Sequence, residues 1–189
     1  MPQQERALRT REKLLEAAQR ELSAHGYAKA TARSIARAAG VATGSFYQYF
    51  ADKDAVLREL GATRLARISD FALGFLGSDA DPRATMRTVV LAVMAYHRED
   101  PGLHAVLTER RAHDPELDAL TTQGERALIA AVQSMLDRWQ HDGDREATAF
   151  ILFSMVEGAI HAHCLGHALV SDERFVDTLI DALVQIALP

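Results

Sequence analysis

One segment, residues 30–57, constrains the fold more than any other part of the chain. It contains two short stretches of helix-forming residues on either side of a tight turn at Gly40. Thr31 can cap the first helix through its hydroxyl group, and the second helix should run from about Thr43 to Tyr49. Small residues before the turn would let the two helices cross closely. The pattern predicts a helix-turn-helix whose second helix keeps its outer face free.

The second helix carries side chains that suit nucleic acid better than a protein core. Its hydroxyl and amide groups belong to Thr43, Ser45, Tyr47, Gln48 and Tyr49. Such groups hydrogen-bond to phosphates and to base edges. Gly44 permits close backbone approach, while Phe46 and Phe50 are the expected inward anchors. A helical hairpin inside a core is the alternative, and the number of polar groups argues against it.

Three stretches of this segment resemble the signature of the TetR family of transcriptional regulators almost position by position. They are Ala-Arg-Ala-Ala-Gly-Val at 36–41, Thr-Gly-Ser-Phe-Tyr-Gln-Tyr-Phe at 43–50 and Asp-Lys-Asp-Ala-Val-Leu at 52–57. The resemblance covers about the first 60 residues. It implies an all-helical dimer with an N-terminal DNA-binding domain and a larger C-terminal domain that binds a small-molecule effector.

The resemblance also implies which residues contact double-stranded DNA. The residues expected at backbone phosphates of the operator are Thr31 and Arg33. Those expected in the groove are Thr43, Gly44, Ser45 and Gln48. Those expected to clamp further phosphates are Tyr47, Tyr49 and Lys53. Thr43 departs from the family pattern, because many relatives carry lysine there, so the expected base preference differs.

Helical periodicity dominates the rest of the chain. The sequence predicts an all-α protein of about nine helices, with a helix-turn-helix domain at residues 1–51 and a helical regulatory and dimerisation domain at residues 52–189. The expected helices run over Ala7–Ala24, after Thr31, over Thr43–Tyr49, after Asp52, from Pro82, from Pro101, from Pro115, over Arg145–Val170 and over Asp172–Leu188. Residues 1–60 carry a formal charge of +3 and residues 61–189 a charge of −8. This asymmetry is expected when only one end meets phosphate.

A ligand pocket is expected among the middle helices, and its apolar walls favour a hydrophobic effector. The candidate residues are Phe71, Phe75, Met94, His97, Trp139, Phe150, Glu157 and His161. Each of them is also typical of an ordinary core. Glu157, His161 and Cys164 recur along one helical side. They form either a ligand or metal site, or a structural set containing a buried i,i+4 pair, which is the favoured interpretation.

The helix predicted at 145–170 is apolar nearly all round, so most of its sides must be covered. The resemblance implies a homodimer in which the last two helices of each chain form a four-helix bundle. The interface candidates are Gly158, Ala162, Leu165, Phe175, Leu179 and Leu183. A membrane span is the alternative, but Glu157 and three histidines would be costly in lipid. We expect a buried helix in a cytoplasmic protein without membrane contact.

The sequence shows no nucleophile elbow, Walker loop or dinucleotide fingerprint. We therefore predict that the protein is not an enzyme and has no catalytic residue, metal site or cofactor. The leading hypothesis is a repressor that binds a palindromic operator as a dimer and is released by a small, hydrophobic ligand. A constitutive DNA-binding regulator and a helical small-molecule carrier are the alternatives.

Overall fold

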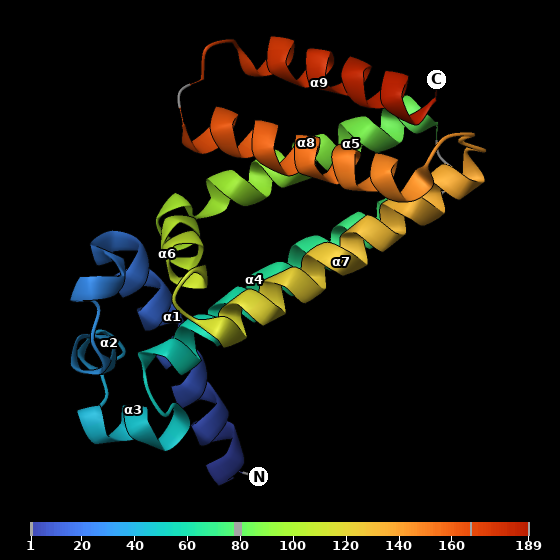
Figure 1. Ribbon diagram of the computed structural model, residues 1–189. Coiled ribbons are helices and arrows are strands. Elements are labelled where there is room, and N and C mark those ends of the chain that lie inside the picture. Colours follow the sequence, from blue (N-terminus) through green and yellow to red (C-terminus); the bar gives the residue numbers. More distant parts are fainter. Residues whose placement is uncertain (1, 78–80, 167, 189) are drawn as a thin grey trace. The chain divides into compact units, whose positions relative to one another are not determined.

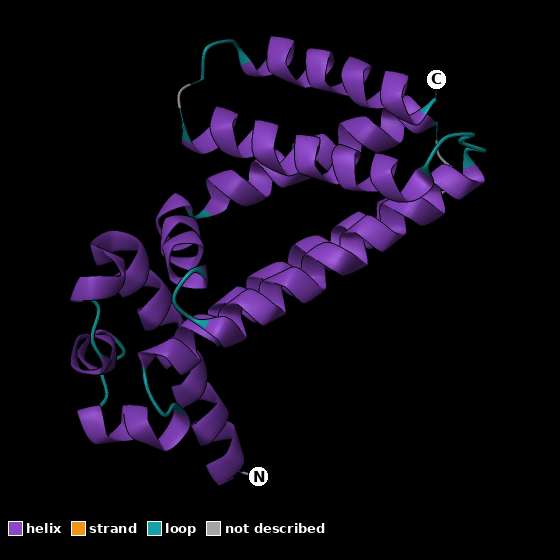
Figure 2. Ribbon diagram, viewed as in Figure 1, coloured by secondary structure: helices purple, strands orange, loops and turns teal. Residues whose placement is uncertain are grey.

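The computed structural model describes residues 2–77, 81–166 and 168–188. Within these ranges every regular element is a helix, and there is no strand (Figure 2). The helices are α1 (Pro2–Lys29), α2 (Ala32–Ala38), α3 (Thr43–Tyr49), α4 (Lys53–Leu76), α5 (Pro82–Glu99), α6 (Pro101–Arg111), α7 (Pro115–Arg138), α8 (Arg145–Leu165) and α9 (Asp172–Ala187). The all-α prediction is therefore confirmed.

Local sequence signals account for most of the helix boundaries. α3 has the predicted bounds, and proline opens α5, α6 and α7, where its missing N–H costs no intrahelical hydrogen bond. Asp52 caps α4, because its Oδ1 accepts the N–H of Ala55 at 2.8 Å. Gly26 interrupts α1 with φ 74° and ψ 170°, at the predicted stop. α8 ends at Leu165, well before the predicted end at Val170.

The chain divides into two compact units. Unit 1 is the chain up to Arg64 together with Asp100–Leu120, and unit 2 is Leu65–Glu99 together with the chain from Thr121 onward. α4 and α7 therefore contribute residues to both units. This packing division differs from the predicted functional division at residue 51, because α6 and the start of α7 pack with the N-terminal helices. The functional division stays a prediction.

Unit 1 has its own core, in which α1 packs against α2 and α6, and α2 packs against α3 (Figure 1). Its fully buried side chains include Leu14, Leu22, Ile35, Phe46 and Leu57. Leu8 is 59% exposed and lies outside this core. Among the described residues, the buried side of α1 begins at Leu14.

In unit 2, α5 packs against α8 and α9, which also pack against each other (Figure 1). The buried residues of α5 include Met86, Val89, Val90, Val93, Met94 and His97. The part of α4 in this unit turns Ala72 and Leu76 inward. The pocket candidates Phe71 and Phe75 lie outside the buried core of this unit, because they are 39% and 38% exposed. Each lies one position before an inward residue, and a helix turns by about 100° per residue.

α8 is long and apolar enough to cross a membrane by length and composition, with a mean hydropathy of 1.4 over its most apolar window. Only 22% of that window is buried within one chain, so the single chain does not supply the expected cover on most sides of this helix. Its exposed apolar residues include Phe150 and Ile151. A core helix of a soluble protein passes the same test, so this one helix is weak evidence for a membrane.

Candidate DNA-binding surface and effector cavity

Two local devices fix the helix-turn-helix. Thr31 and Ser34 form a reciprocal cap at the start of α2, in which each side-chain oxygen accepts the other residue's backbone N–H at 3.0 Å. Gly40 ends α2 with φ 70°, a left-handed conformation that favours glycine. The next N–H, of Val41, donates to the carbonyl of Ala36 at 3.0 Å, which completes a helix-ending Schellman turn. The predicted cap and turn are thereby confirmed.

α3 presents a polar face to solvent. Phe46 is fully buried and Phe50 nearly so, as predicted, which anchors the helix on the core of unit 1. The residues of α3 that are exposed are Thr43, Gly44, Tyr47 and Gln48. A Cβ built on Gly44 would meet no other atom within 4 Å, and its φ is not positive. Neither packing nor backbone geometry therefore requires glycine at this position.

The remaining predicted DNA contacts lie around α3 in two different environments. Thr31 and Arg33 are exposed at the start of α2. Ser45 and Tyr49 are half-buried, and the Tyr49 ring packs against the core of unit 1. Arg37, which we did not single out from the sequence, is exposed one helical turn after Arg33. This i,i+4 spacing puts the two guanidinium groups on one face of α2.

Lys53 has a structural role that the sequence did not reveal. Its Nζ donates to the carbonyl oxygens of Tyr27 at 2.6 Å and Ala30 at 2.9 Å, and it lies 3.7 Å from the centre of the Tyr27 ring. Burial lowers the pKa of the Lys53 ammonium. The side chain thus joins the start of α4 to the end of α1. Its predicted contact with a DNA phosphate stays a prediction.

Tyr27 links three helices of unit 1. Its hydroxyl donates to Oδ1 of Asp54 on α4 at 2.6 Å, and the Arg110 guanidinium of α6 lies 4.0 Å from its ring centre. Burial and the hydrogen bond to Asp54 raise the pKa of Tyr27 to about 12. α6 is also tied to α1 through Asp100, whose Oδ2 accepts from Gln19 and Ser23 at 2.9 Å each. These contacts support α1 and α4, which flank the helix-turn-helix.

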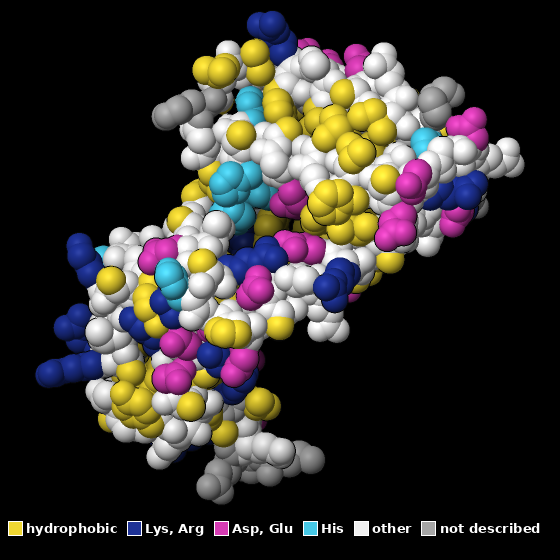
Figure 3. Space-filling model, in the orientation of Figure 1, with side chains coloured by type: hydrophobic (Ala, Val, Ile, Leu, Met, Phe, Trp, Pro, Cys, Tyr) yellow, Lys and Arg dark blue, Asp and Glu magenta, His cyan; other side chains and the backbone are white. Residues whose placement is uncertain are grey.

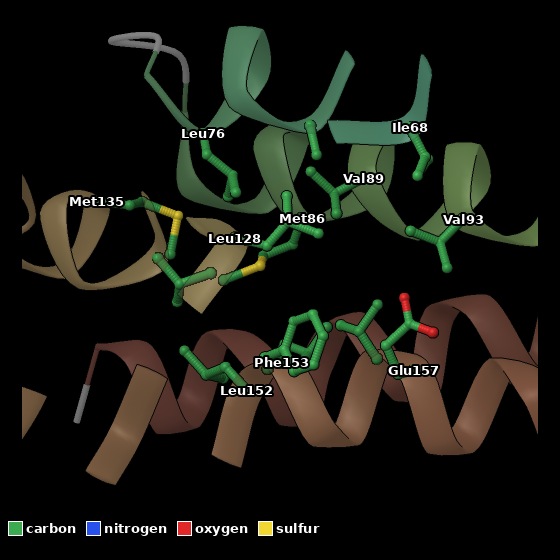
Figure 4. Close-up of a pocket in the computed structure, with 14 residues that line it drawn as sticks. Ile68, Leu76, Met86, Val89, Val93, Leu128, Met135, Leu152, Phe153 and Glu157 are labelled. Carbon is green, nitrogen blue, oxygen red and sulfur yellow. The ribbon is translucent and has the colours of Figure 1, made fainter. Parts of the chain in front are cut away.

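Unit 2 encloses a small apolar cavity of about 50 Å³ (Figure 4). Residues of five helices line it: Ile68, Ala72, Leu76, Met86, Val89, Val93, Leu128, Val132, Met135, Leu152, Phe153, Val156, Glu157 and Leu183. The list contains one charged residue. Such a cavity can admit an apolar group, but pockets that bind drug-sized ligands measure roughly 300–1,000 Å³. Binding a ligand of that size requires the walls to move apart.

Of the eight predicted pocket residues, Glu157 is the one that lines this cavity. Met94 and His97 are buried in α5, and Trp139 packs partly buried against the core of unit 2. Those with larger exposure are Phe71, Phe75, Phe150 and His161. The sequence does not distinguish a lining residue from its neighbours in a core, because the same apolar residue types serve both.

Glu157 lies near other titratable groups. One of its carboxylate oxygens is 3.8 Å from Nε2 of the buried His97, too long for a hydrogen bond, and the His161 ring meets the His97 ring edge-on at 5.9 Å. Burial and the nearby Glu125 raise the pKa of Glu157 to about 7. Cys164 is half-buried, and burial raises its pKa. Glu157 lines the cavity, whereas His161, one turn later on the same helix, is exposed.

α8 presents an exposed apolar face, and hydrophobic side chains gather over it in Figure 3. The exposed residues of this face include Phe150, Ile151, Gly158 and Ala162, while Leu165 is half-buried. A Cβ on Gly158 would meet no atom within 4 Å. Three of the predicted interface residues, Gly158, Ala162 and Leu165, thus keep surface available for a partner.

The α9 interface candidates are placed differently. Leu183 is fully buried and lines the cavity, so it has no surface to bury in a dimer and its interface prediction is corrected. Leu179 is 7% exposed and belongs to the same core. Phe175 is half-buried and stacks on the His163 ring at 4.0 Å. The strongly amphipathic α9 turns its apolar side toward its own chain, which periodicity alone does not specify.

Comparisons with known proteins agree with this architecture. Residues 14–60 match the family described as bacterial regulatory proteins, tetR family, and residues 81–185 match the tetracyclin repressor-like C-terminal domain. The HTH-type transcriptional regulator TtgR of Pseudomonas putida is 28% identical over 201 residues, which cover 95% of this chain and 93% of that protein. The HTH-type transcriptional repressor AcnR of Corynebacterium efficiens is 25% identical over 140 residues, covering 71% of this chain and 68% of that protein.

Solved structures share the fold. FadR from Bacillus subtilis, in complex with stearoyl-CoA, has a TM-score of 0.75 at 17% identity, covering 92% of this chain and 97% of that one. A TetR transcription regulator from Haloarcula marismortui has a TM-score of 0.74 at 19% identity, covering 94% and 96%. The C-terminal match alone spans more than half of the sequence. The chain belongs to the TetR family, and it is a DNA-binding transcriptional regulator rather than an enzyme.

Proposed function

We propose that the protein is a cytoplasmic repressor that binds a palindromic operator as a homodimer and is released by a small hydrophobic effector. In this proposal residues 1–51 recognise the operator, and residues 52–189 form the dimer and sense the effector. The observation that supports gating most directly is the apolar cavity of unit 2, enclosed by α4, α5, α7, α8 and α9. A ligand there contacts helices that also carry the dimer face.

The exposed face of α8 supports the homodimer. Monomeric proteins rarely expose large contiguous apolar surfaces. On α8, the apolar side chains of Phe150 and Ile151 are 59% and 47% exposed. Gly158 and Ala162 are small and exposed on the same helix, which allows a second helix to approach closely. A second copy of α8 offers the matching surface, because two-fold dimers bury the same patch on both subunits.

The exposed residues of α3 and the two-fold symmetry of the proposed dimer together support a palindromic operator. Gln48, Thr43 and Gly44 are exposed where they can reach a groove, and Thr31, Arg33 and Arg37 flank them for phosphate contacts. A symmetric dimer presents two recognition helices, so it reads two inverted half-sites whose centres lie about 34–36 Å apart. The symmetry of the operator follows from the symmetry of the protein.

Ligand gating follows if the effector prefers one spacing of the two recognition helices. A ligand shifts the equilibrium only by its differential affinity for the two states. A coupling of about 1–3 kcal/mol changes operator affinity by roughly 5–150-fold. Because the cavity holds about 50 Å³, an effector must widen it, and the flexible side chains of Met86 and Met135 lie in its wall. FadR of Bacillus subtilis, which has the same fold, was solved with stearoyl-CoA.

The small volume of the cavity also favours a second candidate function, a constitutive DNA-binding regulator. In that case the apolar space is a packing defect and the protein binds its operator without any effector. The two candidates agree on the operator and the dimer, and they differ only in whether the interior of unit 2 binds a ligand.

Operator release measured by fluorescence anisotropy separates the two candidates. The wild type should release a selected operator duplex when small apolar compounds are added, here a phenylbutyl series with cationic, neutral and anionic head groups. Val156→Phe, which fills the cavity, should keep its operator affinity and lose the response. Ala130→Phe, on the exposed side of α7, is the matched control and should respond like the wild type. An equal response in all three proteins would contradict gating through this cavity.

A further inference from the structure

The exposed side of α1 carries a row of cations. Arg6, Lys13 and Arg20 recur every seven residues, which places them on one side of the helix at intervals of about 10.5 Å. All three side chains are exposed, and none of them has an ion-pair partner among the described residues. Arg9 lies between the first two, and its side chain stays 71% exposed in an i,i+4 pair with Glu5. The row is therefore available to an anionic partner.

The two units treat their cations differently. In unit 2, five arginines each lie within 3.0 Å of a carboxylate: Arg67, Arg83, Arg87, Arg98 and Arg145. In the described part of unit 1, the exposed cations without such a partner all belong to α1 and α2: Arg6, Lys13, Arg20, Lys29, Arg33 and Arg37. A cation without a partner gives up no ion pair when it meets a phosphate. The helices next to the helix-turn-helix thus keep the cations that can bind phosphate most readily.

The first turns of α1 lie at the α3 end of unit 1. The Arg11 guanidinium is 5.2 Å from the centre of the Phe50 ring, and Phe50 directly follows the last residue of α3. Farther along α1, Gln19 donates to Asp100 at the start of α6 at 2.9 Å. Figure 1 shows the same order, with the N-terminal end of α1 near α3 and its later turns near α6. Because the buried side of α1 begins at Leu14, the turns nearest α3 keep their charged side chains exposed.

We propose that α1 is a second DNA-contacting element, in which Arg6, Arg9 and Lys13 bind backbone phosphates that flank the bases recognised by α3. This inference rests on the proposed operator recognition and extends it beyond the helix-turn-helix. Duplex DNA carries one charge about every 1.7 Å along its axis, so each of these cations can find a phosphate within reach. Arg20 lies on the same side of α1 but about 21 Å from Arg6, toward α6, and is outside this contact.

The acidic residues of the same turns do not close this surface to DNA. Glu5 and Glu12 each come one position before a cation of the row, so they point about 100° away from it around the helix. The exposed pair of Glu5 with Arg9 contributes little to stability, so Arg9 can exchange it for a phosphate. Phosphate contacts release counterions and carry no base information. α1 should therefore strengthen binding in a salt-dependent way without changing the preferred bases.

Fluorescence anisotropy with two duplexes of the selected operator tests this inference. The short duplex ends at the outer edges of the half-sites, and the long duplex continues on each side for one helical turn, about ten base pairs. The full-length wild type is compared with a variant that combines Arg6→Gln, Arg9→Gln and Lys13→Gln. Glutamine removes the charge and keeps a high helix propensity, so the variant should unfold in urea like the wild type. Arg20→Gln, on the same side of α1, is the matched control.

The wild type should bind the long duplex at least about tenfold more tightly than the short one. The triple variant should reduce this preference to about threefold or less and lower the salt slope on the long duplex by about two to three, whereas Arg20→Gln should match the wild type. A preference that survives the triple substitution, an equal loss in Arg20→Gln, or equal wild-type affinities for both duplexes would overturn the inference and leave recognition by α3 intact. No binding of the wild type to either duplex would overturn the proposed operator recognition as well.

Discussion

Among the described residues, α3 and α8 each keep an exposed face, and the two faces have opposite chemistry. α3 of unit 1 exposes hydroxyl and amide groups around Gly44, whereas α8 of unit 2 exposes apolar side chains around Gly158. Both glycines have open space where a Cβ would lie. Packing inside one chain therefore explains neither glycine, and both positions are available for the close approach of a partner.

The chemistry of each face indicates the kind of partner. A polar face on a short helix suits phosphates and base edges, which present hydrogen-bond acceptors and donors. An apolar face on a long helix suits another apolar surface, because its burial removes apolar area from water. The TetR-family match supports the first assignment for this chain. The homodimer and the effector are proposals that the following changes would test.

The largest effect is expected from Gly158→Leu. The leucine side chain would occupy the space where the second α8 is proposed to lie, so the dimer dissociation constant should rise at least about thirtyfold. Sedimentation velocity over a concentration series measures it. Gly74→Leu on α4 is the matched control, because Gly74 is also exposed with open space around its Cβ. An unchanged dimer in Gly158→Leu would remove α8 from the interface.

A smaller effect is expected from Gly44→Ala. The methyl group would stand between α3 and the DNA, and operator affinity should fall roughly tenfold, the scale of one lost charge-assisted hydrogen bond. Chemical unfolding should show unchanged or slightly raised stability, since alanine favours a helix by up to about 1 kcal/mol over glycine. Unchanged operator affinity in a folded variant would show that α3 does not approach DNA closely at this position.

The Lys53→Ala variant tests whether the Lys53 side chain stabilises the fold of unit 1 or contacts a DNA phosphate. The ammonium donates to two carbonyl groups at the end of α1, so the free energy of unfolding should fall by about 1–2 kcal/mol. Urea denaturation of the free protein measures this loss. A variant with wild-type stability whose operator affinity has a reduced salt dependence would instead assign Lys53 to a phosphate.

The smallest effect concerns Glu157 and pH. Its folded-state pKa of about 7 lies above the ordinary value, so stability is greatest below about pH 4 and is lost as pH rises through 7. Glu157→Gln removes this loss and should be more stable than the wild type at pH 8, by no more than about 1 kcal/mol because solvent screens the partly exposed carboxylate. Thermal unfolding at pH 5 and pH 8 measures the difference. A constant difference between the two proteins at both pH values would contradict the raised pKa.

The helix-turn-helix could be predicted from the sequence because its determinants are local. Thr31 reaches Ser34 within one helical turn, and Gly40 ends α2 through its own backbone conformation. α3 follows this turn closely and has the predicted bounds, Thr43–Tyr49. Short-range hydrogen bonds and backbone preferences are visible in a window of a few residues.

The placement of several other residues depends on contacts that are distant in the sequence. Lys53 meets the carbonyls of Tyr27 and Ala30, more than twenty residues earlier, and no local pattern indicates this pairing. On α4, the core contains Ala72 and Leu76, while Phe71 and Phe75, each one position earlier, are exposed. A rotation of the helix by one residue would exchange the two pairs. Periodicity identifies an amphipathic helix but does not say which neighbour each side contacts.

Selection of random DNA duplexes for binding at two salt concentrations is the most direct test of the central claim, that α3 binds DNA and α8 binds a second copy of the chain. The account predicts enrichment of a palindrome whose half-site centres lie about 34–36 Å apart, with affinity that falls as salt rises. Enrichment of a single unsymmetrical half-site would contradict the two-fold dimer. No enrichment and no salt dependence would contradict the assignment of α3 as the recognition helix.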